Sequence, residues 1–265
     1  MLRALFILGI WLIGASGAVA QQGGLVTLST GQDGRGWEAV GRIDIDGKGF
    51  CTGVLIREDL VLTAAHCVYD HDGRPIAPEK FEFLAGLRSG RAEAYRDVRR
   101  VVAHPDFRPA NGNGLPSEVA SDIALLQLSQ PIRTTRIEPF RIAARPYAGE
   151  AVGVVSYARD RQDAPSLQQV CEVLGQQEGV LVLTCDVDFG ASGSPVFRVS
   201  AGVAQIVSVV SAMAMLDTRK VSLGTSLEAP LQTLLAVIDG TVMLGGQPVL
   251  LSGERSDTGA KFVRP

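Results

Sequence analysis

The chain has 265 residues, a formal net charge of −3, four cysteines and three histidines, and 46% of its residues are hydrophobic. A mildly acidic chain without a block of basic residues is not typical of nucleic-acid-binding proteins, so we expect no nucleic-acid partner. The length suits one compact unit with a sizeable core.

The first 20 residues have the pattern of a secretory signal peptide. Arg3 precedes an apolar run over residues 4–13, and small residues stand at positions 18 and 20, just before Gln21. The run is too short for a membrane anchor, and no later stretch is long and apolar enough to span a bilayer. We therefore expect a secreted protein, periplasmic or extracellular, without membrane association after processing. Residues 21–35 then form an N-terminal segment.

The four cysteines predict disulfide bonds in an oxidising compartment. Of the three possible pairings we favour Cys51–Cys67 and Cys171–Cys185, because each closes a short loop between adjacent strands. A zinc site is disfavoured, since there is no Cys-x-x-Cys pair and no histidine near the second pair of cysteines. The loop at 69–80 lacks the full set of oxygen ligands that calcium requires. We expect no metal and no cofactor.

Short apolar runs alternate with glycine, proline, asparagine and aspartate along most of the chain, which is typical of an all-β protein. The expected strands include residues 54–56, 60–63, 81–84, 98–102, 123–128, 151–157, 169–174, 180–184, 195–199 and 203–211. Their even spacing indicates barrels or sandwiches. Residues 227–238 have apolar positions at helical spacing. The tail, 241–265, forms a C-terminal extension in which 242–244 and 249–251 suggest a hairpin.

Residues 190–195, GASGSP, form a predicted turn of small residues in which Ser192 has Gly190 two positions before it and Gly193 directly after it. Such a turn exposes the serine hydroxyl and directs the amides of Gly190 and Ser192 to one point, where an oxyanion forms. Taken alone, the motif also fits an ordinary surface turn, because turns of small residues are common.

A serine nucleophile needs a base, and two motifs upstream of Ser192 supply candidates. His66 ends an apolar strand in TAAHC, and Asp122 stands at the start of the buried strand DIALLQL. The order His66, Asp122, Ser192 excludes the Ser-Asp-His order of α/β-hydrolases and is that of the chymotrypsin-type triad.

Four motifs together resemble the chymotrypsin/trypsin clan of serine proteases: CTGVLI at 51–56, TAAHC at 63–67, DIALLQL at 122–128 and GASGSP at 190–195. The GxSGSP form is similar to the secreted bacterial branch that includes the glutamyl endopeptidases. The resemblance implies two six-stranded Greek-key β-barrels, with lobes at 36–135 and 136–240, a C-terminal helix and a site between the lobes. It implies a serine endopeptidase that acts on proteins or peptides, and we expect a monomer.

The resemblance also implies a role for each site residue. His66 is the base, Asp122 orients it, Ser192 attacks the carbonyl, and the amides of Gly190 and Ser192 bind the oxyanion. Ser208 loosely matches the clan serine that supports the aspartate and lines the cleft. A strand hydroxyl bound to the backbone fits Ser208 nearly as well.

The residue that sets substrate preference is open. Asp186 lies six positions before Ser192, where trypsin-like members hold the acid that binds a basic P1 side chain, although Asp188 competes for this role. Ser211, with its two following residues, would instead line a pocket for a small or apolar P1 side chain. A glutamyl preference is disfavoured, because no histidine follows His104.

Position 191 holds alanine instead of the aspartate that captures a freshly cut N-terminus in the animal-type enzymes. We therefore expect Arg42 and Ile43 to lie in an internal strand and not at an activation cleavage site. Two other functions remain open. One is a non-catalytic binding module on the same fold, and the other is an esterase that uses the same triad.

Overall fold

The computed structural model describes residues 24–109, 116–241 and 250–251, and this part of the chain is mostly β. The signal peptide expected at 1–20 lies outside the described residues. A first group of strands comprises β2 (Val40–Ile45), β3 (Gly49–Arg57), β4 (Leu60–Thr63), β5 (Phe81–Ala85), β6 (Ala94–Ala103) and β7 (Ala124–Leu128). A second group comprises β8 (Ala151–Ala158), β9 (Arg161–Gln177), β10 (Val180–Leu183), β11 (Pro195–Ser200), β12 (Val203–Leu216) and β13 (Arg219–Ser226).

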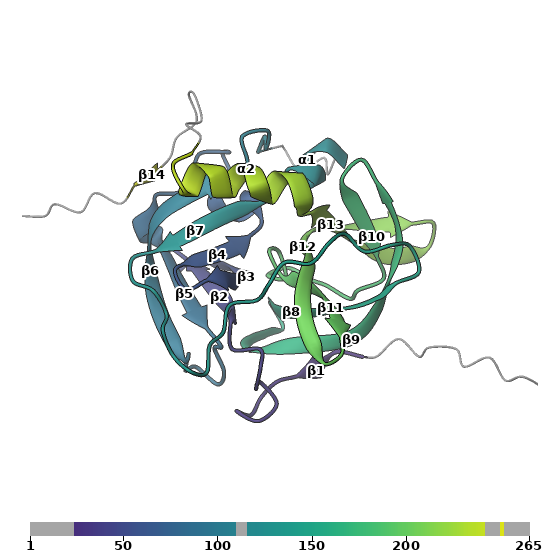
Figure 1. Cartoon of the computed structure of the whole chain (residues 1–265), viewed down its shortest axis with the longest axis horizontal. Coiled ribbons are helices and arrows are strands. Elements are labelled where there is room, and N and C mark those ends of the chain that lie inside the picture. Colours follow the sequence, from purple (N-terminus) through teal and green to yellow (C-terminus); the bar gives the residue numbers. More distant parts are fainter. Residues whose placement is uncertain (1–23, 110–115, 242–249, 252–265) are drawn as a thin grey trace, which may run out of the picture.

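Each group closes into an antiparallel barrel. The first has the order β6-β5-β2-β3-β4-β7 and closes through β6–β7; the second has the order β9-β10-β13-β12-β11-β8 and closes through β8–β9. Figure 1 shows the first barrel on the left and the second on the right. The predicted all-β, two-barrel fold is confirmed, and the predicted lobe boundary at residues 135–136 falls between β7 and β8.

Short elements complete the described residues. Two strands extend the barrels, β1 (Val26–Thr27) against β9 and β14 (Leu250–Leu251) against β6. The helices are α1 (Pro116–Ala120), α2 (Glu228–Ile238) and the 3₁₀ turns η1 (Ala65–Val68) and η2 (Pro78–Lys80). The structure confirms the expected C-terminal helix as α2. For the hairpin suggested in the tail, the described part is β14, which pairs with β6. Residues 242–244, its expected partner strand, lie outside the described residues.

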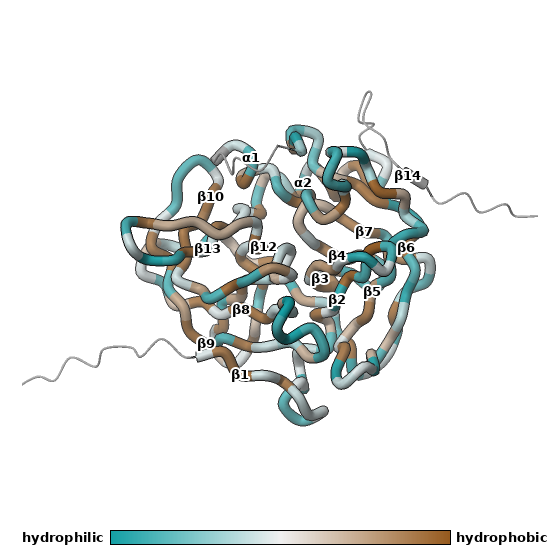
Figure 2. Tube along the Cα trace, turned by 180° about the vertical axis from the view of Figure 1, so that it is seen from behind, coloured by the Kyte–Doolittle hydropathy of each residue, from teal (hydrophilic) through white to brown (hydrophobic). Residues whose placement is uncertain are grey.

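The strands form because apolar side chains recur on the faces that point inward, and Figure 2 shows these residues along the strands, with hydrophilic residues on the outer loops. A shared core also joins the two lobes. The Phe197 ring of β11 lies 4.6 Å from that of Phe140 and 5.0 Å from that of Trp37, centroid to centroid. Burial of such rings contributes to the attraction between the lobes.

Helix α2 follows the last strand of the second barrel but packs on the first lobe (Figure 1). Leu231, Leu234 and Val237 are its buried residues, at a spacing that puts them on one face. Arg100 of β6 donates to the carbonyls of Val237 and Ile238 at the C-terminal end of the helix, where few carbonyls have partners within the helix. The helix therefore ties the end of the second lobe to the first.

The segment around Arg42 is an internal strand, as expected. Ile43 is fully buried, and β2 pairs with β3 on one side and β5 on the other. Among the helices in the described ranges, none is long and apolar enough to cross a membrane.

Candidate active site

His66 is presented by η1, the turn that follows β4. Ala64 and Ala65 before it are fully buried, and Cys67 after it is bonded to Cys51 of β3. Small buried residues on one side and a disulfide on the other fix the backbone of the turn. The His66 side chain nevertheless remains 39% exposed, and so it is accessible to a substrate.

Asp122 holds the imidazole of His66 by two contacts. Its Oδ2 lies 2.7 Å from His66 Nδ1, and its Oδ1 accepts the backbone N–H of His66 over 2.8 Å. The Asp122 side chain is only 4% exposed, so these contacts are shielded from water. This arrangement leaves His66 Nε2 as the nitrogen available for a substrate-side proton transfer.

The charge of Asp122 changes the acidity of His66. Burial opposes the charged imidazolium, but the Asp122 carboxylate and its hydrogen bond outweigh that effect, so the pKa of His66 lies above its ordinary value. A raised pKa strengthens His66 as a base.

The second lobe also supports Asp122. The Ser211 hydroxyl of β12 donates to Asp122 Oδ2 over 2.5 Å. Thr225 Oγ1 of β13 donates to the Val119 carbonyl over 2.7 Å and also lies 3.2 Å from the Asp122 carbonyl oxygen. Two roles were open for Ser208, support of the aspartate or a strand hydroxyl bound to the backbone, and the structure shows the second. Ser208 Oγ donates to the Thr225 carbonyl over 2.9 Å, within the sheet. A register shift of β12 between Val210 and Ala212 separates the two serines and turns Ser211 toward the site.

Ser192 lies in the turn before β11, and the glycines around it are required by its geometry. Gly190 and Gly193 have φ angles of +96° and +80°, in the left-handed region that favours glycine. A Cβ at Gly193 would lie 2.2 Å from the Thr52 carbonyl oxygen. A side chain at position 193 would therefore push the turn away from the first lobe.

The same turn leaves two amides without protein acceptors. In the described part of the chain, the N–H groups of Gly190 and Ser192 donate to no protein acceptor, whereas those of Ala191 and Gly193 donate to the carbonyls of Asp188 and Val210. The two free N–H groups are the pair expected from the sequence to bind an oxyanion. Ala191 is fully buried, in keeping with its apolar side chain.

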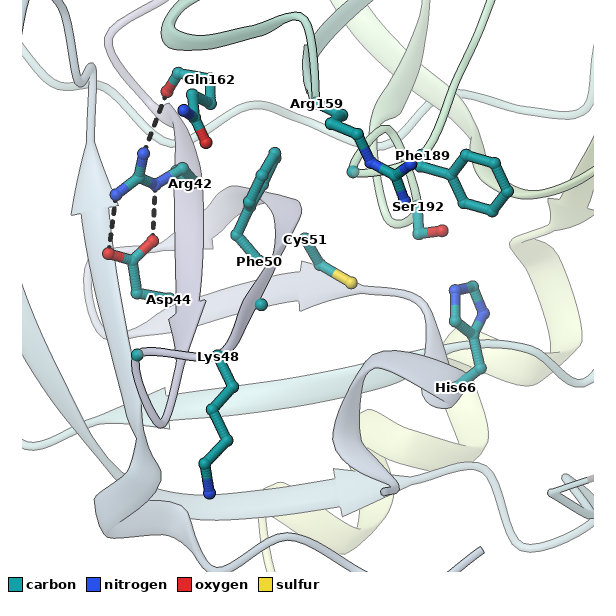
Figure 3. A pocket seen from close by; sticks show the side chains of 13 residues that line it. Arg42, Asp44, Lys48, Phe50, Cys51, His66, Arg159, Gln162, Phe189 and Ser192 are labelled. Atoms are coloured by element: carbon teal, nitrogen blue, oxygen red, sulfur yellow. Dashed lines mark hydrogen bonds and ion pairs between the residues drawn. The ribbon is translucent and has the colours of Figure 1, made fainter. Parts of the chain in front are cut away.

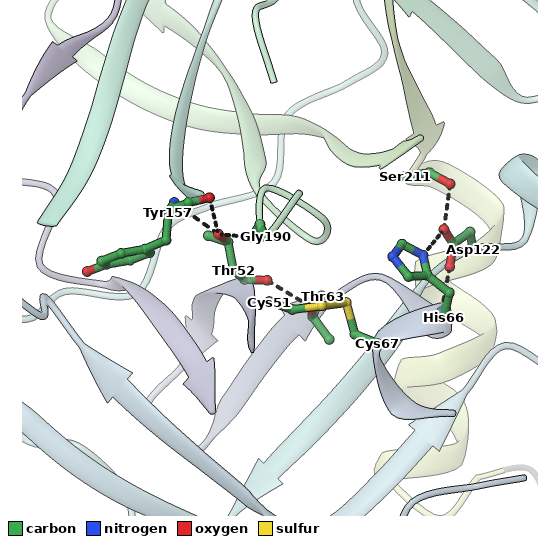
Figure 4. The surroundings of a disulfide bond; sticks show 9 residues. All are labelled: Cys51, Thr52, Thr63, His66, Cys67, Asp122, Tyr157, Gly190 and Ser211. Atoms are coloured by element: carbon green, nitrogen blue, oxygen red, sulfur yellow. Dashed lines mark hydrogen bonds and ion pairs between the residues drawn. A yellow bond between two sulfur atoms is a disulfide. The ribbon is translucent and has the colours of Figure 1, made fainter. Parts of the chain in front are cut away.

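Thr52 of β3 fixes this turn from the first lobe. Its hydroxyl donates to the Gly190 carbonyl over 3.0 Å and accepts the Tyr157 N–H over 3.1 Å, and its own N–H donates to the Ser192 carbonyl over 2.9 Å. Figure 4 shows Thr52 between the ends of the two lobes, beside the disulfide. Thr52 therefore fixes the carbonyls of Gly190 and Ser192 and, with them, the orientation of the turn.

One pocket brings the proposed nucleophile and base together. Ser192 and His66 both line a cavity of about 710 Å³, together with Gly190, Cys51 and Phe50. Figure 3 shows Ser192 and His66 at the same end of this pocket. The site therefore assembles a hydroxyl, an imidazole supported by a carboxylate, and two free amides.

The cysteines pair as expected, Cys51 with Cys67 and Cys171 with Cys185. The sulfurs of Cys51 and Cys67 and the imidazole of His66 lie within 4.8 Å of one another. Thiolates bind metals, but both sulfurs here belong to a disulfide, so the three atoms do not form a metal site.

Asp186 lies apart from the pocket that Ser192 and His66 share, and its side chain is 62% exposed. Its N–H donates to Gln168 Oε1 over 2.7 Å, and its Oδ1 lies 3.5 Å from Lys220 Nζ. The acid expected to bind a basic P1 side chain therefore already faces a lysine of the same chain.

The sequence analysis missed Thr52, Thr225 and Tyr157, which support the site by hydrogen bonds across the fold. It also missed Arg159 and Phe189, which line the pocket. Threonine in the CTGVLI motif was visible, but its partners are more than 100 residues away, and no local pattern indicates them.

Comparison with known families gives a match to the trypsin family over residues 29–221. This range covers most of the chain and contains His66, Asp122 and Ser192, the residues expected to form a triad. The chain belongs to the trypsin family. Two trypsin-like relatives are human granzyme H, 31% identical over 93 residues (35% of this chain, 33% of the relative), and human serine protease 56, 29% identical over 143 residues (51% of this chain, 22% of the relative).

Clotting factor C of Tachypleus tridentatus is another relative, 36% identical over 96 residues (34% of this chain, 9% of the relative). The matches therefore span about a third or less of these trypsin-like relatives. Among solved structures, a Glu endopeptidase in complex with MPD superposes with a TM-score of 0.66 at 18% identity, covering 83% of this chain and 98% of that one. A scabies mite inactivated protease paralogue superposes with a TM-score of 0.63 at 15% identity, covering 84% and 98%. These structures establish the chymotrypsin-like fold.

Proposed function

We propose that the chain is a serine endopeptidase that cleaves peptide bonds through an acyl-enzyme, with Ser192, His66 and Asp122 as its triad. The observation that carries the proposal is the bidentate hold of Asp122 on His66, next to Ser192 and two free amides in one pocket.

In this mechanism, His66 takes the proton of Ser192 as the hydroxyl attacks the peptide carbonyl, and later gives it to the leaving amine. Asp122 fixes the tautomer and stabilises the imidazolium. The N–H groups of Gly190 and Ser192 bind the oxyanion, and the loss of one such donor typically costs about 3 kcal/mol. Water then attacks the acyl-enzyme, with His66 again as the base.

Labelling of oxidised protein with a fluorophosphonate probe tests the proposal. We expect stoichiometric labelling of the parent, none in Ser192→Ala, and strongly slowed labelling in His66→Ala. Folded parent protein that does not label would instead support a binding module. This comparison matters because the fold is shared with a protease paralogue described as inactivated. An esterase is separated from a peptidase by kcat/KM on matched amides and esters.

For the P1 residue, we propose a preference for basic side chains through Asp186, with Lys220 as a competitor. The 3.5 Å contact between Lys220 Nζ and Asp186 Oδ1 supports this competition. Lys220→Ser should raise kcat/KM for peptides with Arg or Lys in P1, and Asp186→Ser should lower it. If neither variant changes the P1 profile in a peptide library, a small or apolar P1 residue beside Ser211 is the better proposal.

We propose a monomer that acts on protein or peptide substrates in an oxidising compartment outside the cytoplasm. The two disulfides support this location, because such bonds rarely persist in the cytosol. Fractionation of the host cell, with a thiol count on the recovered protein, tests the proposal. Recovery from the cytosol with four free thiols would contradict it.

A further inference from the structure

The pocket that contains Ser192 lies on the disulfide side of the triad. Figure 4 shows Cys51 and Cys67 on one side of His66, and Asp122 with Ser211 on the other. If the acyl part of a substrate lies beside Ser211, the alternative P1 position named above, the peptide beyond the scissile bond crosses the disulfide side. The pocket then receives the leaving segment of the substrate.

Cations dominate the charged side chains that line this pocket, but most of them have partners. Arg42 binds Asp44 through Nε and Nη2, over 2.5 and 2.7 Å. Lys48 Nζ lies 2.6 Å from Asp46. Arg159 differs from both: in the described part of the chain, no carboxylate oxygen lies within 4.0 Å of its guanidinium, so its charge is not balanced locally.

Arg159 is nevertheless held in place. Its backbone N–H donates to the Phe189 carbonyl over 2.8 Å, and its guanidinium lies 4.7 Å from the centroid of the Phe189 ring. Phe189 directly precedes Gly190, and its side chain is among the exposed large apolar groups, at 61%. The cation–π contact restrains the guanidinium beside the proposed oxyanion site (Figure 3).

We propose that Arg159 binds a carboxylate side chain in the first two residues after the scissile bond, so that the substrates are peptides with Asp or Glu on the leaving side. This inference rests on the proposed endopeptidase function and on the placement of the acyl part beside Ser211. A guanidinium with an open planar edge binds a carboxylate through two parallel hydrogen bonds. The Arg159 guanidinium carbon lies over the Phe189 ring, 4.7 Å from its centroid, and Arg159 lines the pocket, so the ring contact restrains the guanidinium without supplying a carboxylate partner.

The test compares pairs of amidated peptides that share one cleavable sequence and differ by Glu or Gln in P1′ or P2′. For the parent we expect kcat/KM to be about fivefold higher with Glu, the effect of a partly exposed ion pair. The ratio should fall toward about one at high salt, because screening weakens exposed charges. Glu placed two residues before the scissile bond should bring no gain.

Variants at position 159 test whether Arg159 causes the preference for Glu over Gln peptides. Arg159→Gln should abolish the Glu-to-Gln ratio, and Arg159→Lys should retain part of it, since lysine keeps the charge without the planar fork. Arg145→Gln is the matched control: Arg145 is exposed, makes no ion pair in the described part of the chain and does not line this pocket. It should retain the full ratio.

Labelling with the fluorophosphonate probe separates the two ways to fail. If the parent labels and cleaves Glu and Gln peptides equally, or if Arg159→Gln keeps the ratio, the role of Arg159 is wrong and the endopeptidase function stands. A gain from Glu before the scissile bond overturns the assigned direction of the substrate. If folded parent neither labels nor cleaves any peptide, the proposed function fails, and this inference fails with it.

Discussion

The Ser211 hydroxyl of the second lobe donates a 2.5 Å hydrogen bond to Asp122 Oδ2 of the first lobe, the same oxygen that contacts His66 Nδ1. Asp122 is thus shared between a base on its own lobe and a donor on the other. The position of the imidazole depends on how the two lobes meet.

Ser211→Ala removes a donor that offsets part of the Asp122 charge. The pKa of His66, already above its ordinary value, should rise further, and the acid limb of the pH–kcat/KM profile should move to higher pH. Loss of a hydrogen bond to a charged group should also lower the free energy of unfolding by about 1.5–3 kcal/mol. Ser208→Ala is the control, because Ser208 bonds to Thr225 and should leave the limb in place. An unmoved limb in Ser211→Ala would contradict the coupling.

Asp122→Asn should shift the limb in the opposite direction. The proposed base must be neutral, so activity is lost as the pH falls through the His66 pKa, which the Asp122 charge holds above its ordinary value. Without that charge the pKa falls, the limb moves to lower pH, and the plateau drops by a factor on the order of 10⁴. A pH–rate profile on one peptide measures both. A limb that stays at the parent's pH would show that Asp122 does not set the His66 pKa.

Thr52→Val keeps the shape of the side chain and removes its hydroxyl. The Gly190 carbonyl and the buried Tyr157 N–H lose their partner, which should cost about 1–3 kcal/mol of unfolding free energy. Fluorophosphonate labelling should also slow under conditions where the variant is fully folded, because the Gly190 and Ser192 amides are no longer held in position. Thr52→Ser should restore both properties. Parent-like labelling in folded Thr52→Val would show that the turn does not need this bond.

The two disulfides close loops of similar size, with separations of 16 and 14 residues, but only one adjoins His66. Replacing either pair by alanine should remove about 3 kcal/mol in the chain-entropy description. Only C51A/C67A should also lower kcat/KM at a temperature where both variants are folded. Thermal unfolding followed by peptide assays checks this. An equal loss of activity in C171A/C185A would mean that global stability, and not the His66 turn, is responsible.

The sequence indicated the fold and the triad residues because these depend on local patterns. Apolar runs marked the strands. In TAAHC and GASGSP, the residues next to His66 and Ser192 are small, as tight turns require. Of the two roles open for Ser208, the structure shows the hydroxyl bound to the backbone, and Ser211 contacts Asp122 instead. A β-bulge changes which strand residue faces the site, and the alternation of apolar and polar residues does not reveal it. Asp186 was placed by counting back from Ser192, but its contact with Lys220 depends on the pairing of distant segments.

Thr52 has a consequence for any attempt to exchange lobes between trypsin-family proteins. The turn that contains Ser192 belongs to the second lobe, yet its Gly190 and Ser192 carbonyls both accept hydrogen bonds from Thr52 of the first lobe. A chimera that takes its second lobe from this chain would need a hydroxyl-bearing residue at the equivalent of position 52. A compatible barrel with alanine there would keep the backbone donor to the Ser192 carbonyl but leave the Gly190 carbonyl without its hydroxyl donor. Lobe exchange in this family is thus constrained by a single side chain at the junction.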